Sequence, residues 1–252
     1  MNVTAARRVE QIRATMERTR QFLHDLPERF VVVNFASFSA YLIDKGQPAW
    51  STRIIVGTKE KETPVFRASI ESFTINPEWN VPESIVREEL LPGLARDPKK
   101  LEKMHIRRVG NRYVQEGGSH NSLGRIKFNM PNEHAVYLHD TPSKALFDRR
   151  ERAFSHGCVR TEHPFVLAAL LLAEPGRDAA ALEKEAHNGK TRTFKLREPV
   201  PVLVTTWSVV VAADGRVDFL PDIYGQDDDV LLGLDGKTAG RSEQGTAATT
   251  RN

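Results

Sequence analysis

The chain has 252 residues, of which 40% are hydrophobic and 27% charged, with a formal net charge of +3. These fractions are typical of a globular protein, and the length suits one large domain, alone or with an inserted segment. The net charge is too small to indicate nucleic-acid binding, no nucleic-acid-binding motif is present, and no apolar run approaches the roughly 18 residues needed to span a membrane.

The chain opens with a predicted amphipathic helix at residues 4–24. Apolar residues recur there at steps of three and four, and arginine and glutamate fill the positions between them. Pro27 ends the helix, so residues 1–28 are predicted to form a helical segment packed on the edge of a domain. The first ten residues lack the hydrophobic core of a signal peptide, and we expect the chain to be a trimmed fragment of a longer protein.

The next segments alternate apolar and polar residues, which predicts strands. Residues 29–35, 39–44 and 50–57 are rich in β-branched and aromatic side chains, and Gly46 supplies a turn. They are expected to be successive strands of an antiparallel meander, followed by a further strand at 68–76.

A long polar segment interrupts the strands. Asn80 and Pro82 mark the start of a short predicted helix, with Ile85 and Leu90 on its apolar face. Residues 93–120 are basic and polar and show no strong periodicity. A loop of this length in a compact domain is usually functional, and the alternative is a disordered surface insertion.

Strands are predicted at 121–130 and 134–139, and the second of these delivers His139 at its end. The following excursion to Cys158 contains Pro142 and several arginines, which suit an exposed loop.

The remaining segments in chain order are predicted from their apolar patterns and turn residues. They are a helix at 164–173 with proline in its first turn, a helix at 178–187, a strand at 199–212 closed into a hairpin by Asp214-Gly215, and a polar tail at 226–252 that we expect to be disordered.

The single cysteine of the chain, Cys158, lies in the run Ser-His-Gly-Cys-Val-Arg at residues 155–160. A lone cysteine is usually a small buried hydrophobe. Here a glycine allows close backbone approach, and an adjacent histidine favours the thiolate that attacks carbonyl carbon. A position at the N-terminus of the helix that follows would favour the thiolate further. These neighbours indicate a nucleophile.

The run from Tyr137 through His139 to residues 155–160 resembles the signature of the L,D-transpeptidase catalytic domain (YkuD-like) family, closest to its larger periplasmic Gram-negative branch. Residues 76–92 resemble that branch as well. The resemblance implies a mainly β fold with α (α+β), a sandwich or barrel of mostly antiparallel strands with a few helices. It also implies that residues 29–225 form the catalytic domain and that residues 80–120 are a lid over the active site.

The same resemblance implies roles for the residues of the motif. Cys158 is the expected nucleophile and His139 the proton donor and acceptor. His156 is the rival base nearest in sequence, and in the family it supports the site. Asp140 is expected to orient the imidazole of His139, through its carboxylate or, as is commoner in the family, through a backbone carbonyl.

Substrate recognition and oxyanion stabilisation are expected from neighbouring groups. The backbone N–H groups of Gly157 and Cys158, with the Tyr137 hydroxyl, are candidates for the oxyanion hole. Trp79 either stacks on the substrate or anchors its own segment. Arg160 either holds a substrate carboxylate or braces the loop. Scattered histidines and one cysteine give no zinc spacing, so no metal or other cofactor is predicted. The predicted substrate-binding residues are Tyr137, Arg160, Ser155 and Trp79.

By resemblance, the chain is expected to be a peptidoglycan L,D-transpeptidase. It would cleave the terminal D-Ala of a tetrapeptide donor stem through a cysteine thioester and form 3→3 cross-links with an acceptor stem. The alternatives are an L,D-carboxypeptidase, a relative that anchors wall proteins, and a catalytically silent wall-binding module. Carbapenems are expected to acylate Cys158. A periplasmic location is expected, with membrane association only through parts absent from this chain.

Overall fold

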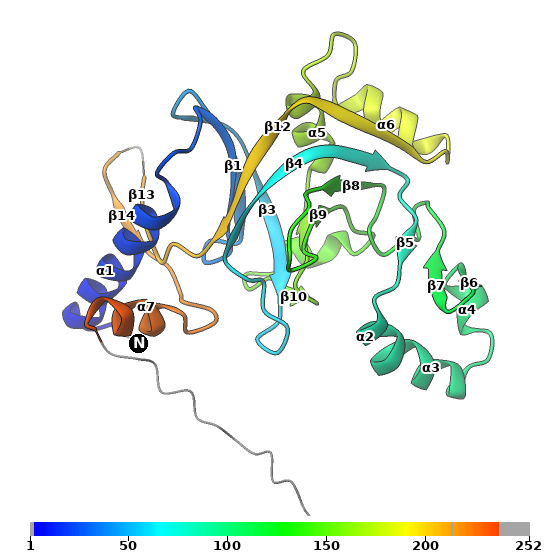
Figure 1. Ribbon diagram of the computed structural model, residues 1–252, viewed down its shortest axis with the longest axis horizontal. Helices are drawn as coiled ribbons and strands as arrows, with labels where there is room; N and C mark the ends of the chain where they lie inside the picture. The colour runs from blue at the N-terminus through cyan, green and yellow to red at the C-terminus, as the bar shows by residue number, and fades with distance from the viewer. Residues whose placement is uncertain (1–2, 213, 237–252) are drawn as a thin grey trace, which may run out of the picture.

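The computed structural model describes residues 3–212 and 214–236. Its largest element is a nine-stranded sheet in the order β10-β3-β11-β9-β8-β4-β12-β1-β2, in which β2 also pairs with β3. That pairing closes the sheet into a barrel with β10 outside the ring (Figure 1). The strands are β1 (Arg29–Asn34), β2 (Ser39–Asp44), β3 (Gln47–Gly57), β4 (Phe66–Ile75), β8 (Ile126–Asn129), β9 (Leu138–His139), β10 (Ala153–Ser155), β11 (Val159–Thr161) and β12 (Arg192–Thr205).

The strand pairing is mostly antiparallel, as predicted, and the fold is of the mixed α+β class. Strands β1, β2 and β3 form the expected meander. The meander does not extend to β4, which pairs with β12 and β8 instead. The reason is that β12 returns from far along the chain and inserts between β4 and β1, where it runs parallel to β1.

Three predicted strands have different limits in the structure. The strand expected at 121–130 is confined to β8, because Gly124 turns the backbone at φ +63°. The strand expected at 134–139 is only β9, and Ala135 before it has φ +52°. Strand β12 begins at Arg192, earlier than the apolar run suggested, because exposed and buried residues alternate from that point.

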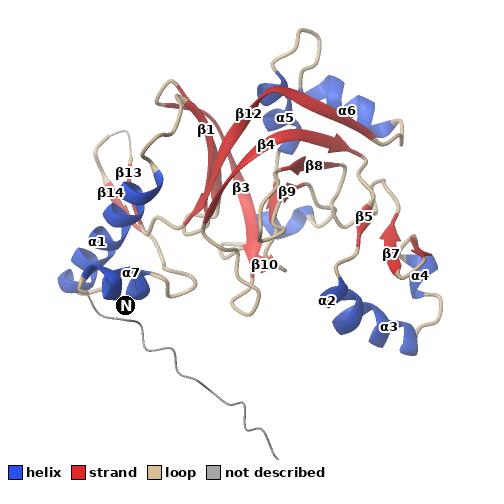
Figure 2. Cartoon of the chain, in the orientation of Figure 1, coloured by secondary structure: helices blue, strands red, loops and turns tan. Residues whose placement is uncertain are grey.

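Helices lie outside the barrel (Figure 2). Helix α5 (Pro164–Leu172) packs on β12 and on α6 (Ala179–His187). Six of its nine residues are buried, as expected for a helix that is apolar on most sides. Helix α6 begins where the Asp178 carboxylate accepts a hydrogen bond of 2.8 Å from the Ala181 N–H. No helix within residues 3–212 and 214–236 is both long and apolar enough to cross a membrane.

The two ends of the described chain lie side by side (Figure 1). Helix α1 (Ala5–Phe22) contacts helix α7 (Asp227–Leu234) and the hairpin of β13 (Val209–Val211) with β14 (Val217–Phe219). The disorder predicted for residues 226–252 is therefore wrong over helix α7, whereas residues 237–252 lie outside the described residues.

A buried ion pair holds α7 in place. Arg18 of α1 is 3% exposed and Asp227 of α7 is fully buried, and they form a salt bridge. The second carboxylate oxygen of Asp227 accepts a hydrogen bond of 2.7 Å from the Ser208 hydroxyl. A buried carboxylate needs such partners, which composition does not reveal.

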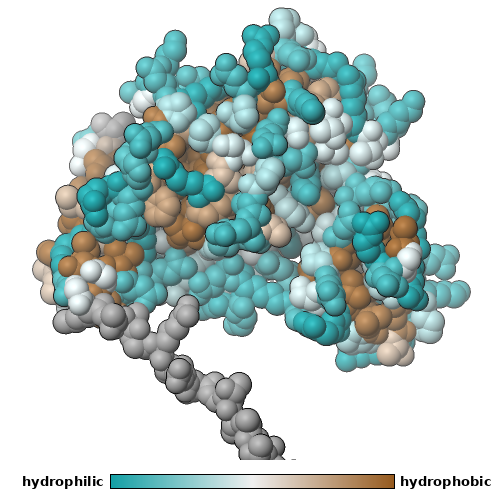
Figure 3. Space-filling view, in the orientation of Figure 1, coloured by the Kyte–Doolittle hydropathy of each residue, from teal (hydrophilic) through white to brown (hydrophobic). Residues whose placement is uncertain are grey.

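Residues 79–115 form a separate lobe at the lower right of Figure 1. It holds a small sheet in the order β5-β7-β6 and several helical turns, so the lack of regular structure expected for 93–120 is wrong. Gly110, at φ +61°, closes the β6–β7 hairpin, and Ile106 and Val114 are buried under it. An apolar strip bordered by hydrophilic residues runs along the lobe (Figure 3). Its elements are β5 (Trp79–Asn80), α2 (Glu83–Ile85), a π-helical turn (Val86–Leu90), α3 (Leu91–Arg96), α4 (Lys100–Lys103), β6 (Ile106–Val109) and β7 (Arg112–Gln115).

The ion pair between α1 and α7 gives a test of this end of the fold. We expect Asp227→Ala to lower the free energy of unfolding by about 3–5 kcal/mol, because it leaves the Arg18 guanidinium buried without its counter-charge. The matched control is Asp228→Ala, because Asp228 pairs with Arg7 at the surface and such pairs contribute at most about 1 kcal/mol. Urea denaturation followed by circular dichroism measures both, and equal losses would contradict the assignment.

Candidate active site

The pairing of three short strands brings the motif residues together. Strand β11 runs parallel to β9, with Arg160 opposite His139, and the Val159 N–H donates a hydrogen bond of 3.0 Å to the Tyr137 carbonyl. Strand β8 lies on the other side of β9, with Lys127 opposite His139. Segments distant in the sequence therefore meet at one place on the barrel.

Alternation along these strands decides which side chains face the site. Leu138, Val159 and Phe128 are fully buried in the barrel core. Because successive side chains point to opposite faces, their neighbours point away from that core. Those neighbours and Cys158 line a cavity of about 610 Å³ outside the core. They are Lys127, Tyr137, His139, Cys158 and Arg160.

Cys158 lies in a tight turn between β10 and β11. Gly157 has φ +108°, a conformation that favours glycine, and its carbonyl accepts a hydrogen bond of 2.8 Å from the buried Thr63 hydroxyl. Helix α5 begins only at Pro164, after β11. Cys158 therefore does not lie at the N-terminus of α5, and the condition under which that helix would favour the thiolate is not met.

Ser155 braces this turn. Its hydroxyl donates a hydrogen bond of 2.6 Å to the Cys158 carbonyl and accepts one of 3.1 Å from the Gly157 N–H. The Gly157 N–H, predicted as an oxyanion donor, is thus already engaged. Of the predicted donors, this leaves the Cys158 N–H and the Tyr137 hydroxyl. Ser155 is 3% exposed, and its contacts are those of a residue that shapes the turn.

His139 is buried and held in one orientation. Its Nδ1 lies 2.5 Å from the carbonyl oxygen of Asp140. A carbonyl only accepts, so Nδ1 carries the proton and, in a neutral ring, Nε2 keeps its lone pair. Burial, followed by the charge of Arg160, lowers the pKa of His139 to about 3. The ring is therefore neutral at physiological pH and able to accept a proton.

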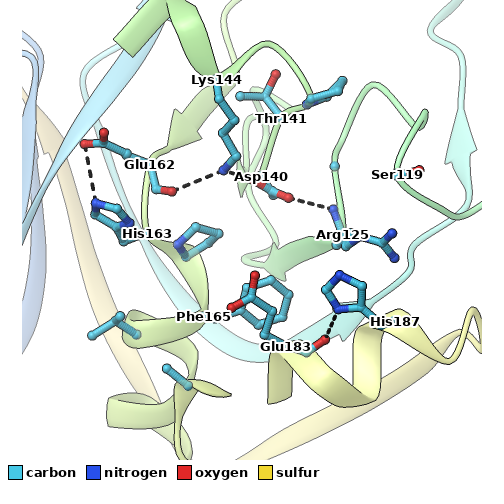
Figure 4. A pocket seen from close by; sticks show the side chains of 15 residues that line it. Ser119, Arg125, Asp140, Thr141, Lys144, Glu162, His163, Phe165, Glu183 and His187 are labelled. Carbon is cyan, nitrogen blue, oxygen red and sulfur yellow. Dashed lines mark hydrogen bonds and ion pairs between the residues drawn. The ribbon is translucent and has the colours of Figure 1, made fainter. Parts of the chain in front are cut away.

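The carboxylate of Asp140 points elsewhere. It accepts hydrogen bonds from the Arg125 N–H at 2.8 Å and from the Lys144 ammonium at 2.5 Å. Both contacts lie in a second cavity of about 290 Å³ (Figure 4). Gly124 permits this approach, because a Cβ there would lie 2.4 Å from the Asp140 carboxyl carbon. The predicted orienting role therefore belongs to the Asp140 backbone carbonyl and not to its side chain.

The Cys158 thiol is partly buried and faces Tyr137. Its sulfur lies 3.9 Å from the Ala135 carbonyl. Burial raises the pKa of the thiol, while hydrogen bonds to Tyr137 and the charges of Lys127 and Arg160 oppose the rise. The thiol is therefore neutral at pH 7.

In this conformation the contacts of the sulfur are to Ala135 and Tyr137 and not to His139. The register sets Cys158 beside Tyr137, with His139 two positions farther along the neighbouring strand. Both side chains therefore line one cavity without a hydrogen bond between them in this conformation.

Aromatic groups form part of the cavity wall. The Tyr137 ring packs edge-on against His139 at 5.6 Å between centroids, and burial raises the pKa of its hydroxyl. Tyr137 therefore stays protonated and can donate a hydrogen bond. Trp79 also lines the cavity, and a side-chain hydrogen bond between Trp79 and Tyr137 opposes part of the rise in the pKa of that hydroxyl.

The lobe of residues 79–115 closes the other side of the cavity. His156 is exposed, and its Nε2 lies 2.5 Å from the Glu89 carboxylate in the π-helical turn of that lobe. A second contact joins Lys61 to Glu88 at 2.6 Å. His156 thus connects the nucleophile turn to the lobe.

Three residues contact the site in the structure but were given no role from the sequence: Thr63, Glu89 and Lys127. Thr63, which holds the Gly157 carbonyl, begins the run Thr-Pro-Val-Phe at residues 63–66, which also resembles the family, but no role was predicted for its hydroxyl. Glu89 lies within residues 76–92, which resemble the same branch, but no contact was predicted for it. Lys127 had a usable signal, because it lies between two apolar residues of a predicted strand, on the face opposite to them. Among the described residues, no three histidine, cysteine, aspartate or glutamate side chains gather as metal ligands.

Comparisons with known proteins point to one family. Residues 28–202 match the sequence profile of the YkuD family, the L,D-transpeptidase catalytic domain. A protein of Haemophilus influenzae, provisionally named an L,D-transpeptidase, is 32% identical over 225 residues. The match covers 80% of this chain and 45% of that protein, so the chain spans about half of its relative's length.

Solved structures resemble the fold more distantly. An L,D-transpeptidase from Mycobacterium smegmatis has a TM-score of 0.38 and 12% identity, covering 70% of this chain and 58% of the other. The catalytic domain of an Enterococcus faecium L,D-transpeptidase acylated by ertapenem has a TM-score of 0.36 and 13% identity, covering 71% of this chain and 98% of the other.

The neutral thiol and neutral imidazole make a testable prediction about pH. We expect alkylation of Cys158 by iodoacetamide to rise with a midpoint above the ordinary thiol value of about 8.5, because burial disfavours the thiolate. The urea-unfolded chain is the matched control, since it holds the same single cysteine without the burial. A midpoint below pH 7 in the folded protein would instead indicate a thiolate–imidazolium pair.

Proposed function

Because this chain belongs to the L,D-transpeptidase catalytic domain family, we propose that it transfers acyl groups of peptidoglycan stem peptides through a thioester on Cys158. The observation that carries the proposal is the shared cavity of Cys158 and a buried, neutral, carbonyl-oriented His139. A neutral imidazole whose Nε2 carries no proton is the form that a general base requires.

The first half of the reaction follows from these groups. The sulfur attacks the carbonyl carbon of the third stem residue while Nε2 of His139 takes the thiol proton. The tetrahedral intermediate then breaks its C–N bond, and the imidazolium returns the proton to the departing amine of the terminal D-Ala. The products are a thioester on Cys158 and free D-Ala.

The second half reverses the proton path. A side-chain amine of a neighbouring stem attacks the thioester, His139 takes a proton from it, and the sulfur leaves as the thiol. The product is a 3→3 cross-link. Water in place of the amine gives a carboxypeptidase, and a protein amine gives a wall-anchoring enzyme. The β-lactam carbonyl of a carbapenem would acylate the same sulfur.

Two groups are suited to hold the developing oxyanion. The Cys158 N–H is fixed by the turn that Ser155 braces, and the Tyr137 hydroxyl stays protonated because burial raises its pKa. Donors oriented before the reaction stabilise a developing negative charge at little reorganisation cost. We propose a periplasmic location, in keeping with peptidoglycan as the proposed substrate.

We propose further that residues 80–120 act as the lid. The lobe of residues 79–115, which makes up most of this lid, lines the same cavity as Cys158 through Trp79, Ile85, Glu89 and Leu90. The lobe is tied to the barrel by two exposed contacts, the hydrogen bond between Glu89 and His156 and the ion pair between Glu88 and Lys61. Ties of this strength can open and close with the substrate.

Product analysis tests the proposed reaction. We expect the protein to release D-Ala from a tetrapeptide stem, and to form a cross-linked product when an acceptor stem is added. Cys158→Ser is expected to reduce the rate by at least about 10⁴-fold, because the nucleophile is lost. His139→Ala is expected to reduce it by about 10²–10⁴-fold through loss of the general base.

Mass spectrometry of the products measures these rates, and His24→Ala, at an exposed histidine outside the cavity, is the control. Release of D-Ala without cross-linking would make the protein a carboxypeptidase. Absence of any thioester adduct, with a donor stem or with a carbapenem, would contradict the proposal and favour a silent wall-binding module.

The lid makes a separate prediction. We expect Glu89→Gln to speed hydrogen exchange in residues 83–96 by up to about fivefold, because it removes a tie of at most about 1 kcal/mol to His156. Glu83→Gln is the matched control, since Glu83 is exposed on the same lobe and makes no ion pair among the described residues. Equal exchange in the two variants would show that the Glu89 contact does not hold the lid.

A further inference from the structure

A lysine that the mechanism does not use faces the active-site cavity. Lys127 lies on β8 between Ile126 and Phe128, both fully buried in the barrel core, so its side chain points to the opposite face. Its Nζ lies 4.1 Å from the centre of the Tyr137 ring, and it stands opposite His139 in the strand register. Among the described residues it makes no ion pair with a carboxylate.

Arg160 approaches the same space from the other side. It stands opposite His139 on β11, and its Nε is buried with no hydrogen-bond partner among the described residues. A buried guanidinium N–H without an acceptor is costly unless a ligand supplies one. Lys127 and Arg160 therefore flank the strand that carries His139.

The charges of the cavity do not balance. The two carboxylates that also line it are engaged by other partners, Glu78 with Arg107 at 2.7 Å and Glu89 with His156 at 2.5 Å. The negative charge that acts on both Lys127 and Arg160 is that of the Cys158 thiol when it is ionised. Even when that thiol is ionised, two cations face one anion, and His139 is neutral.

We propose that Lys127 and Arg160 together bind the terminal carboxylate of the donor peptide, the carboxylate that departs with the leaving amino acid. The assignment rests on the proposed function, in which the last residue of the stem is removed. That carboxylate is joined to the scissile carbonyl through only N and Cα, so it lies within about 4 Å of the carbon that the sulfur attacks. Two cations beside the sulfur are at the right place to receive it.

This arrangement makes the enzyme specific for the C-terminal end of the donor peptide. A donor with a free carboxylate neutralises the surplus charge and gives the Arg160 guanidinium an acceptor. An internal peptide bond at the same position presents a neutral amide and leaves both cations unpaired. The cavity therefore selects donors that end one residue after the scissile bond.

The same cations also face the thiol, and the test separates the two roles. Binding of the leaving carboxylate predicts a loss confined to donors that have one. A role limited to stabilising the thiolate predicts an equal loss for every donor and a slower reaction with neutral iodoacetamide.

The experiment compares two tetrapeptide stems, one ending in a free carboxylate and one in a carboxamide, by kcat/KM for release of the last residue. We expect the wild type to prefer the carboxylate by about 10–100-fold, the range of a charge-assisted hydrogen bond to a buried cation. Lys127→Met is expected to remove most of this preference by slowing only the carboxylate donor. Arg160→Gln is expected to act in the same direction, and Lys127→Arg to retain the preference.

Lys195→Met is the matched control, because Lys195 is an exposed strand lysine outside the cavity, and it is expected to change neither rate. Equal rates on the two donors in the wild type would overturn the assignment while leaving the proposed function intact. An equal loss on both donors in Lys127→Met, with slower alkylation of Cys158, would also overturn it in favour of the thiolate role. Turnover of neither donor by the wild type would overturn the proposed function itself, and the carboxylate assignment with it.

Discussion

The parallel pairing of β9 with β11 is the constraint on which the site depends. The hydrogen bond from the Val159 N–H to the Tyr137 carbonyl fixes the register, and the register decides that Cys158, His139 and Arg160 face one cavity. A slip by one residue would turn these side chains into the barrel core and bring Leu138 and Val159 out. The fully buried Leu138 and Val159 oppose such a slip, so packing in the core holds the chemical groups in place.

Burial then sets the charge state of the reacting pair. A thiol and an imidazole are both kept neutral by a partly closed, apolar setting, and the imidazole is held by a carbonyl rather than a carboxylate. A carboxylate at that point would raise the pKa of the ring and favour the imidazolium in the resting protein. The Asp140 side chain is turned into the second cavity, where Lys144 holds it. The surplus positive charge of Lys127 and Arg160 is left for an anionic ligand.

Some of these features could be predicted from the sequence and others could not. The motif around Cys158 indicated the nucleophile and the base, because the residue types that such chemistry needs are few and closely spaced. Apolar periodicity also located α1, α5 and the first three strands. It did not foretell that β12 separates β4 from β1, since strand order depends on contacts between distant segments.

The features that were misjudged or left open share a physical reason. For Asp140 the sequence left the choice between carboxylate and carbonyl open, and for the Gly157 N–H and residues 226–252 it gave the wrong expectation. Their partners are Lys144, Ser155 and, for helix α7, the buried Arg18. Hydrogen bonds and ion pairs of this kind belong to the folded chain, and local pattern does not specify them.

The central claim is that a neutral imidazole, protonated on Nδ1, stands ready to accept the proton of a neutral thiol. Nitrogen-15 NMR of the His139 ring in the free protein tests it most directly, with His139→Gln identifying the signal. The account predicts one protonated and one unprotonated ring nitrogen from about pH 5 to pH 8, because burial holds the pKa of His139 far below its usual value of about 6.5. Two protonated ring nitrogens at pH 7 would show an imidazolium paired with a thiolate and would contradict the account.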